Sequence, residues 1–370
     1  RKNKIKSFKF MKNFIVFIDR FTLNKPNGEI ISTFHLISSL EKFSTTIVTS
    51  ETDYKSPNVQ FLLKKKILIL YIYQIFLFMK NLNEHSIIFI NSIYSIKSFM
   101  IPILISKFFS KKDFKIIISP RGMLSDKATR SLKKRFYLKF INIFLKNKFV
   151  IQVSNNMELN DVKNNLNPNC KIIVSSDPIP KPPKFEYYPQ LDKNSLKIVY
   201  FGRLSPIKNV LFAYSVFKKM HQKIVFDVYG EITSTDEYYF DKCNTLLKSI
   251  SSLNYKYKGF ATYKDRLDIL KKYDICFVPS FSENFCHTIY DALSVGTPVL
   301  CSDGVPWSEI NTFKAGKLIP LEQIDEFVNF LHSYIKMNHN EIIQIRKNAY
   351  NCSLEKFKNA KLDLDNLIHS

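Results

Sequence analysis

The stretch 278–302 concentrates residues suited to binding an anion. An apolar run ends there, a polar loop presents Glu283, and a predicted helix begins near Phe285. The backbone N–H groups of Asn284, Phe285 and Cys286 would then lie at a helix N-terminus, where free donors and the helix dipole stabilise negative charge. We therefore expect this loop to face an anionic ligand.

Two cations and a second carboxylate extend this pattern. A predicted strand runs into Gly202, Arg203 follows, and Lys208 stands five residues later at the start of another predicted helix. The planar fork of arginine and the mobile charge of lysine together suit a diphosphate, although either cation alone is more often a solvated surface residue. Asp291 follows Glu283 by about two helical turns. The two carboxylates can therefore contact separate parts of an extended ligand.

The elements that must position these residues alternate in type. Short apolar runs alternate with longer amphipathic ones, which is typical of a parallel α/β fold. We expect strands at 14–18, 46–49, 87–90, 115–119, 149–153, 171–174, 197–200, 223–228, 255–258, 275–278 and 298–301, with helices between most of them. The apolar run 67–79 is too short to cross a bilayer and is interpreted as a buried helix packed on a sheet.

A proline-rich segment divides the chain. Residues 177–190 contain five prolines and have little helical potential. We expect an N-terminal extension (1–12), a first α/β domain (13–176), a linker (177–195), a second α/β domain (196–350), and a helical tail (351–370) that returns towards the first domain. A ligand cleft between the domains, at the carboxyl ends of the strands, follows from this organisation.

The composition indicates which classes of partner the protein could bind. The 370 residues carry a net charge of +23, which indicates anionic partners. Only eight of the cations are arginine, however, and lysine, asparagine, isoleucine and phenylalanine all have AT-rich codons, so codon bias could supply much of the excess. The six cysteines form no C-x-x-C pair, and no residues show metal-ligand spacing. We expect reduced thiols and no bound metal.

The two polar stretches together resemble the nucleotide-sugar glycosyltransferases of family 4. That family has the GT-B fold, an α/β architecture of two Rossmann-like domains whose parallel sheets face each other across a cleft. Its G-R-L-x-x-x-K segment appears as 202–208, its E-x7-E element as Glu283 and Asp291, and its E-G-F-G as 283–286 with Cys286 in place of the second glycine. Residues 296–310 match the strand and loop that follow. In the N-terminal half, Asn27-Gly28 looks like the glycine loop that opens the helix of the family's first β-α-β unit, and SPRGML (119–124) looks like an element of polysaccharide-building members. By this resemblance, 13–176 is the acceptor-side Rossmann-like domain and 196–350 the nucleotide-sugar-binding one.

The resemblance implies a role for each matched residue. Arg203 and Lys208 would bind the donor diphosphate and neutralise the departing nucleotide, Asp291 would bind the ribose, and Glu283 would contact sugar hydroxyls and take part in catalysis. The donor site would be completed by Gly28, Gly202, Asn284 and Phe285. The family retains the anomeric configuration and needs no metal, because the two cations supply the charge stabilisation. No cofactor is expected, and the nucleotide sugar, UDP- or GDP-linked, is the substrate.

Two further positions have open roles. Arg121-Gly122 falls where many relatives carry His-Gly, and an arginine stays charged and cannot act as a general base. Arg121 either binds a phosphate of the acceptor or donor, or is a structural cation that bonds loop carbonyls. Gly122 is expected to permit a turn with positive φ. His287 either lines the cleft or packs in the protein, as a lone helical histidine usually does.

Residues 127–148 bear on the acceptor side, because they interleave Lys and Arg with Phe, Leu and Ile. This pattern suits docking on anionic lipid heads, although an ordinary amphipathic helix with a solvated lysine face also explains it. We expect a cytoplasmic enzyme, peripheral on the inner face of the membrane. It would transfer a hexosyl or N-acetylhexosaminyl group to a growing, lipid-linked glycan of the lipopolysaccharide or capsule type.

Two alternatives stay open. One is a nucleotide-sugar epimerase on the same fold, which would need no acceptor. The other is a basic module that binds a membrane or nucleic acid through its net charge. The paired diphosphate-binding elements argue against this second alternative, and we expect no nucleic-acid partner.

Overall fold

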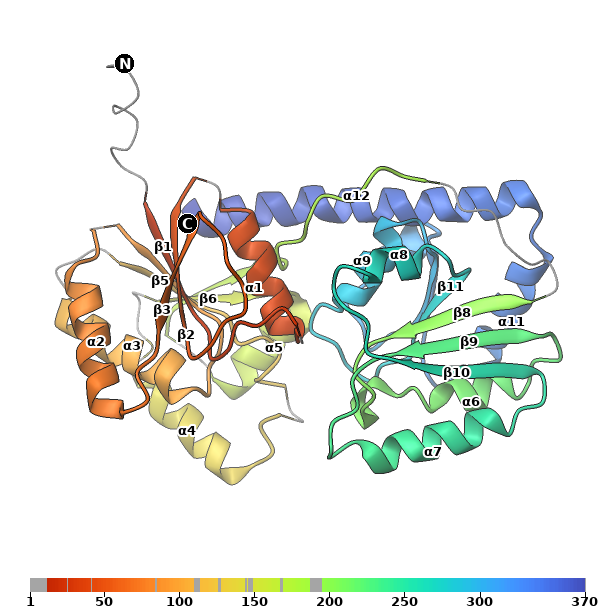
Figure 1. The fold of residues 1–370 in the computed structure, drawn as a ribbon, viewed down its shortest axis with the longest axis horizontal. Helices are drawn as coiled ribbons and strands as arrows, with labels where there is room; N and C mark the ends of the chain where they lie inside the picture. The colour runs from red at the N-terminus through yellow and green to blue at the C-terminus, as the bar shows by residue number, and fades with distance from the viewer. Residues whose placement is uncertain are drawn as a thin grey trace, which may run out of the picture. The chain divides into compact units, whose positions relative to one another are not determined.

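The computed structural model describes residues 12–369 except 25, 41, 84, 110–113, 126–127, 144, 146–148, 167–168 and 187–194. The chain forms two compact units (Figure 1): unit 1 comprises Arg1–Pro180 and Ala360–Ser370, and unit 2 comprises Lys181–Asn359. The border after Pro180 falls in the proline-rich segment. Residues 1–11 of the expected extension and 187–194 of the expected linker lie outside the described residues.

Unit 1 is built on a seven-stranded parallel sheet with the strand order β3-β2-β1-β4-β5-β6-β7. The strands are β1 (Asn13–Phe17), β2 (Ser44–Thr49), β3 (Val59–Leu63), β4 (Ile87–Ile90), β5 (Lys115–Ile118), β6 (Phe149–Val153) and β7 (Lys171–Val174). Every residue of β4 and β6 is buried. Strands covered on both faces need apolar side chains in succession, which explains the unbroken apolar run of β4. The run of β6 is interrupted only by Gln152, whose amide is hydrogen-bonded to Ser119 and Ser175.

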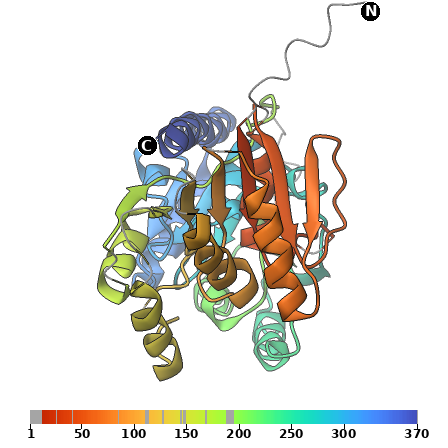
Figure 2. The ribbon, with the colours of Figure 1, turned by 90° about the vertical axis from the view of Figure 1, so that its left-hand side faces the viewer.

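Helices cover both faces of this sheet. On one face lie α1 (Gly28–Ser38) and the end of α12 (His339–His369). On the other lie α2 (Leu68–Lys80), η1 (Ile96–Met100), α3 (Ile101–Ser106), η2 (Lys107–Phe109), α4 (Leu132–Asn142) and α5 (Asn156–Asn165) (Figure 2). Side-chain caps start α1 and α5, where Asn27 accepts from Ile30 N and Asn155 accepts from Glu158 N. The expected Asn27-Gly28 helix start is thus present.

Helix α2 departs from its expected environment. Tyr71, Ile75 and Met79 are fully buried on the sheet, but Ile69 on the opposite side is 77% exposed. The expectation of a buried helix is correct for one side of α2 and wrong for the other. Among the described residues, none of the helices is both long enough and apolar enough to span a membrane.

Unit 2 has a six-stranded parallel sheet in the order β10-β9-β8-β11-β12-β13. Its strands are β8 (Leu196–Phe201), β9 (Ile224–Tyr229), β10 (Leu253–Gly259), β11 (Ile275–Val278), β12 (Val299–Ser302) and β13 (Gly316–Ile319). Its helices are η3 (Pro206–Lys208), α6 (Phe212–Phe217), α7 (Glu237–Lys248), α8 (Arg266–Leu270), α9 (His287–Ser294), α10 (Glu309–Thr312) and α11 (Ile324–Lys336). Close aromatic contacts of Phe277 with Phe217, Phe226 and Phe327 form the centre of the core.

Helix α12 begins in unit 2, and its last residues belong to unit 1. There Lys115 Nζ donates to the carbonyls of Leu367 (2.7 Å) and Ile368 (3.1 Å). Ser176 N donates to Asp363 Oδ2 at 3.0 Å. These bonds attach the C-terminal turns to β5 and to the segment that follows β7.

The one-sided burial of α2 can be tested with two substitutions of the same type. Ile75→Ala should lower the free energy of unfolding by about 2–5 kcal/mol, because it leaves a cavity beneath the helix. Ile69→Ala, on the exposed side, should change it by less than about 0.5 kcal/mol. Urea unfolding followed by circular dichroism measures both effects. Equal losses in the two variants would contradict the described packing of α2.

Candidate functional site

The sheet of unit 2 changes its direction of winding between β8 and β11. From β8 the chain continues to β9 on one side, while β11 pairs with β8 on the other. Loops that leave two such strands diverge at the carboxyl edge, which is where open α/β sheets bind ligands. The two polar stretches, 202–208 and 279–286, follow these two strands. The fold therefore brings together the residues that the sequence motifs single out.

An ion pair joins the two loops. Lys208 Nζ lies 2.6 Å from both Oε1 and Oε2 of Glu283. Ser280 Oγ also donates to Glu283 Oε1, at 2.8 Å. The loop backbones are bonded as well, since Phe281 N donates to the carbonyl of Ile207 at 2.9 Å. The Lys208 side chain is 26% exposed and that of Glu283 10%, so the pair reaches the protein surface mainly through the lysine.

Arg203 and Gly202 lie at the entry to the first of these loops. The Arg203 side chain is exposed, and its carbonyl accepts from the Tyr200 hydroxyl at 2.9 Å. A Cβ added at Gly202 would come within 3.0 Å of the Tyr200 hydroxyl. Gly202 thus leaves room for this bond, which fixes the backbone that presents Arg203.

The helix after the Glu283 loop begins later than expected, at His287. Cys286 precedes it in the left-handed conformation, with φ 66°. A left-handed residue interrupts an α-helix, and it costs about 1–2 kcal/mol when the residue is not glycine. The N–H groups of Asn284 and Phe285 therefore lie in a loop before the helix, not in its first turn. This position is also the one where the resembling motif carries glycine.

The side chains at the start of α9 are buried in the core. Phe285 is buried against Trp307, with ring centroids 5.4 Å apart, and its carbonyl accepts from Trp307 Nε1. His287 is buried against the Phe285 ring at 4.9 Å. Of the two interpretations of His287, the packed one agrees with this burial.

Asp291 is buried, and its carboxylate is already paired with an arginine. Arg266 Nη1 donates to its Oδ2 at 2.8 Å. The guanidinium lies 4.9 Å from the ring centroid of Phe201 and 5.6 Å from that of Tyr263. Burial raises the pKa of Asp291, and the Arg266 charge and hydrogen bond oppose that rise. Asp291 and Arg266 therefore form an ion pair near the end of β8. The sequence motifs single out only the aspartate.

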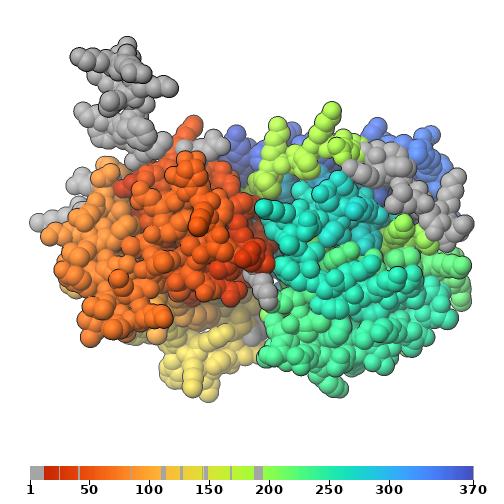
Figure 3. Space-filling model, viewed as in Figure 1, coloured from red at the N-terminus to blue at the C-terminus, as the bar shows by residue number. Residues whose placement is uncertain are grey.

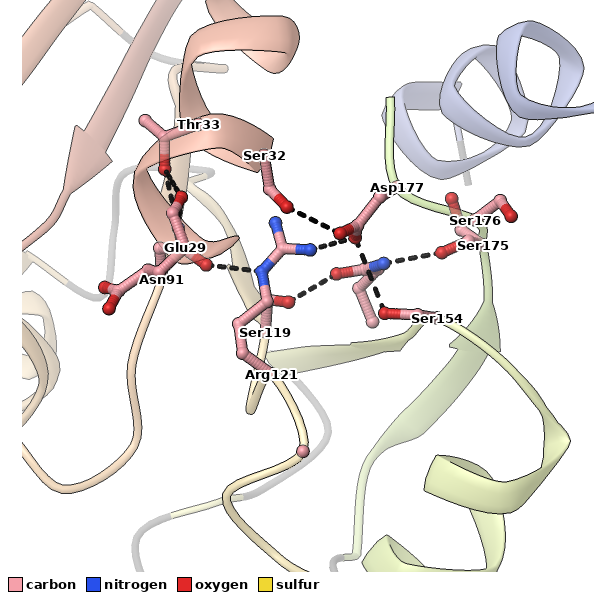
Figure 4. Close-up of polar contacts among 12 residues, drawn as sticks. Glu29, Ser32, Thr33, Asn91, Ser119, Arg121, Ser154, Ser175, Ser176 and Asp177 are labelled. Atoms are coloured by element: carbon pink, nitrogen blue, oxygen red, sulfur yellow. Dashed lines mark hydrogen bonds and ion pairs between the residues drawn. The ribbon is translucent and has the colours of Figure 1, made fainter. Parts of the chain in front are cut away.

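Arg121 in unit 1 is also paired (Figure 4). Its guanidinium bonds Asp177 through Nη1 and donates from Nε to Asn91 Oδ1 at 2.6 Å. Ser32 Oγ and Ser154 Oγ donate to the two oxygens of Asp177, at 2.5 and 3.4 Å. Both charged side chains are less than 10% exposed. The partners of Arg121 are thus a carboxylate and an amide rather than loop carbonyls, while its Nη2 is buried without a hydrogen-bond partner among the described residues. A phosphate contact of Arg121 stays a prediction.

The residues next to this cluster have specific backbone positions. Gly122 has φ 72°, and its N–H donates to Glu158 Oε1 at 2.6 Å. Gly28 is the first residue of α1, and a Cβ added there would meet no atom within 4 Å. Packing within unit 1 therefore does not require glycine at position 28.

Glu29 is a residue that the sequence motifs miss. It follows Gly28 in the first turn of α1, and its Oε1 is buried without a hydrogen-bond partner among the described residues. Burial raises the pKa of Glu29 to about 7, against the opposing charge of Arg121 and with a further contribution from Asp19. An acidic residue after an Asn-Gly helix start is the only sequence signal for it.

Part of the chain matches a known protein family. Residues 186–351 match the family model of glycosyl transferases group 1. No curated protein matches the chain. Among the described residues, no cluster of three or more His, Cys, Asp or Glu side chains could hold a metal ion.

Solved structures match over nearly the whole chain. HepE of Anabaena in complex with UDP has a TM-score of 0.75 at 15% identity, over 97% of this chain and 98% of HepE. The chain has the GT-B fold. Sucrose-phosphate synthase from Thermosynechococcus elongatus matches with a TM-score of 0.72 at 12% identity, over 97% and 98% of the two chains. WaaG, a glycosyltransferase involved in lipopolysaccharide biosynthesis, matches with a TM-score of 0.62 at 11% identity, over 96% and 99%.

The raised pKa of Glu29 predicts a pH-dependent stability. Between pH 4.5 and about 7 the unfolded state ionises at Glu29 while the folded state stays protonated, so the stability contributed by this group falls as pH rises. Above pH 7 the loss reaches up to about 3 kcal/mol. Glu29→Gln removes it, so the variant should be more stable than the wild type at pH 8 and nearly equal to it at pH 4.5. Urea unfolding across this range measures the difference, and a difference independent of pH would contradict the assignment.

Proposed function

We propose that the chain is a glycosyltransferase that binds a nucleotide-diphosphate sugar at the carboxyl edge of the unit 2 sheet. The observation that carries the proposal is the Lys208–Glu283 pair at the switch point, beside the exposed Arg203. The match of residues 186–351 to glycosyl transferases group 1 supports it. So do the solved complexes of HepE, one with UDP and one with UDP-glucose.

The ion pair supplies both kinds of contact that such a donor needs. Lys208 and Glu283 neutralise each other in the free protein. A diphosphate that attracts Lys208 leaves the Glu283 carboxylate to accept hydrogen bonds from sugar hydroxyls. An anion without a sugar, or a sugar without an anion, satisfies only one member of the pair. The pair therefore favours ligands that carry both groups.

The cations also act on the reaction itself. When the sugar leaves the diphosphate, negative charge grows on the leaving phosphate oxygens. Lys208 and Arg203 stabilise that charge more than they stabilise the bound donor, which lowers the barrier. In this proposal the two side chains do the work that a metal does elsewhere, and the transfer retains the anomeric configuration.

Arg266 and Asp291 are proposed to hold the nucleoside side of the donor. Arg266 is fixed by Asp291 and by the rings of Phe201 and Tyr263. A carboxylate held in this way can accept from a ribose hydroxyl while its charge stays balanced by the arginine. Asp291 would then bind the ribose from within an ion pair rather than as a free carboxylate.

The acceptor is proposed to be a growing, lipid-linked surface glycan, and the transferred group a hexosyl or N-acetylhexosaminyl sugar. The SPRGML resemblance at 119–124 favours a polysaccharide-building enzyme. Such an enzyme would work in the cytoplasm, on the inner face of the membrane. A nucleotide-sugar epimerase is the alternative that the assay below separates.

Substitution of Lys208 tests the proposal. Lys208→Ala should lower turnover by about 100-fold or more, because it removes a cation that acts on the leaving diphosphate. The matched control is Lys219→Ala, which breaks an exposed pair of the same 2.6 Å length with Asp325. That variant should stay within about twofold of the wild type. Nuclear magnetic resonance of the products follows transfer, anomeric configuration and free epimerised donor together.

Three outcomes would contradict the proposal. Near-normal turnover of a folded Lys208→Ala variant would overturn the diphosphate assignment. Epimerised donor released without any acceptor would favour the epimerase. Full loss of activity in chelator, restored by Mg²⁺ or Mn²⁺, would show that the two cations do not replace a metal.

A further inference from the structure

Helix α4 exposes a continuous apolar stripe. Four large side chains at spacings of four, four and three residues are between 49% and 71% exposed: Leu132, Phe136, Phe140 and Ile143. This spacing puts them along one side of the helix. The stripe is not needed for packing, because Leu138 and Ile141 on another side of α4 are buried against the sheet. The helix is therefore apolar on two sides, one of which faces solvent.

Helices α2 and α3 lie on the same face of the sheet as α4 and also expose apolar side chains. On α2 the exposed side includes Ile69 and Tyr73, and beside it Phe108 of η2 is among the most exposed apolar residues of the chain. Phe76 links α2 to η2, with its ring 6.4 Å from that of Phe108. Figure 2 turns these helices towards the viewer, and Figure 3 shows α2 in orange and α4 in yellow at the surface of unit 1.

We call this region the α2–α4 surface. Its exposed apolar residues are Leu68, Ile69, Tyr73, Leu104, Phe108, Leu132, Phe136, Phe140 and Ile143. Its exposed cations are Lys65, Lys66, Lys80, Lys107, Arg130, Lys133, Arg135 and Lys139. An exposed apolar patch of this size is unusual on a protein surface and indicates an interaction site.

The charge of the protein is concentrated in the same part of the chain. Residues 54–157, which include α2, α3 and α4, contain 19 Lys and Arg and three Asp and Glu, a net charge of +16 out of the total +23. Residues 158–370 contain 27 Lys and Arg and 24 Asp and Glu, a net charge of +3. Codon bias raises the lysine content throughout, but it does not account for acidic residues being scarce in one segment and frequent in the other. The asymmetry points to selection for a positive surface on unit 1.

We propose that the α2–α4 surface docks unit 1 on a bilayer that contains anionic phospholipid. A stripe of aromatic and aliphatic side chains fits the boundary between headgroups and acyl chains, and the flanking lysines and arginines fit the lipid phosphates. A second copy of the chain would set two strongly positive surfaces against each other, which opposes self-association through this face. This inference deepens the membrane location given in the proposed function, because it names the surface and the lipid class; its evidence lies in unit 1 and does not depend on the donor site in unit 2.

Vesicle co-sedimentation of the full chain tests the proposal. The protein should bind vesicles of phosphatidylcholine with 30% phosphatidylglycerol, bind much less to phosphatidylcholine alone, and lose binding as salt rises. Phe136→Ser with Phe140→Ser should weaken binding about tenfold or more, because both rings leave the interface. Lys133→Glu with Arg135→Glu should weaken it by a similar factor through lost attraction.

Matched controls change exposed residues elsewhere. Tyr238→Ser with Leu362→Ser removes apolar surface on α7 and α12, and Lys347→Glu with Lys361→Glu makes the same charge change on α12. Both control variants should bind vesicles like the wild type. Circular dichroism checks the fold of every variant. Binding in solution of whichever UDP- or GDP-linked sugar the wild type binds shows whether the donor site is intact independently of the membrane.

Several results would overturn the docking proposal. One is no binding to the anionic vesicles, and another is equal weakening by the control variants. A third is a wild-type dimer in solution that the Phe136/Phe140 variant abolishes while vesicle binding stays intact, because a second copy would then occupy the surface. A fourth is salt-sensitive binding of nucleic acid through Lys133 and Arg135 with none to vesicles.

Discussion

The parallel pairing of β8 with β11 is the constraint on which the candidate site depends. Ile198 pairs with Ile275 and Val199 with Cys276, so the two strands end at the same edge of the sheet. The chain leaves β8 and β11 in different directions because β9 lies on the far side of β8. Only this arrangement brings Lys208 and Glu283, 75 residues apart in the sequence, into direct contact. The buried aromatic core below the strands keeps their ends in place.

The charged pairs at the carboxyl edges of the two sheets differ in how far they are buried. In unit 1 the residues that follow β4, β5 and β7 bond one another, with Arg121 held between Asn91 and Asp177 in the interior. A buried pair of this kind is costly to break, because removing one partner leaves an uncompensated buried charge. In unit 2 the Lys208–Glu283 pair is partly open. A partly exposed ion pair can separate so that each member contacts a ligand. A buried ion pair separates only at a high cost in free energy.

The sequence predicts the parallel α/β architecture because β4 and β11 are short, unbroken apolar runs between amphipathic helices, and β6 is one that only Gln152 interrupts. It also predicts the loops of Lys208 and Glu283, because each is a local motif at the end of such a strand. It does not predict the pairing of Arg266 with Asp291 or of Arg121 with Asp177, since these contacts depend on tertiary packing. The start of α9 is missed because nothing in the sequence forces Cys286 into a left-handed conformation. The exposed side of α2 is missed because the helix is apolar all round.

Arginine is scarce in this chain, and three of its arginines are largely buried. Only eight arginines occur beside 47 lysines, yet Arg121, Arg266 and Arg346 all have largely buried guanidinium groups in hydrogen-bonded pairs or loops. A planar fork fixes geometry where a lysine would not. In a chain so rich in lysine, these three arginines occupy positions where the orientation of the charge matters. Arg203 beside the candidate site is exposed, as are Arg20, Arg130 and Arg135.

Titration calorimetry of the full chain against a panel of UDP- and GDP-linked sugars tests the central claim most directly. The account predicts that at least one of these donors binds, that the matching nucleoside binds more weakly, and that Lys208→Met weakens donor binding about tenfold or more while leaving nucleoside binding unchanged. Failure of every donor to bind the folded protein, or donor binding that Lys208→Met leaves unchanged, would contradict it.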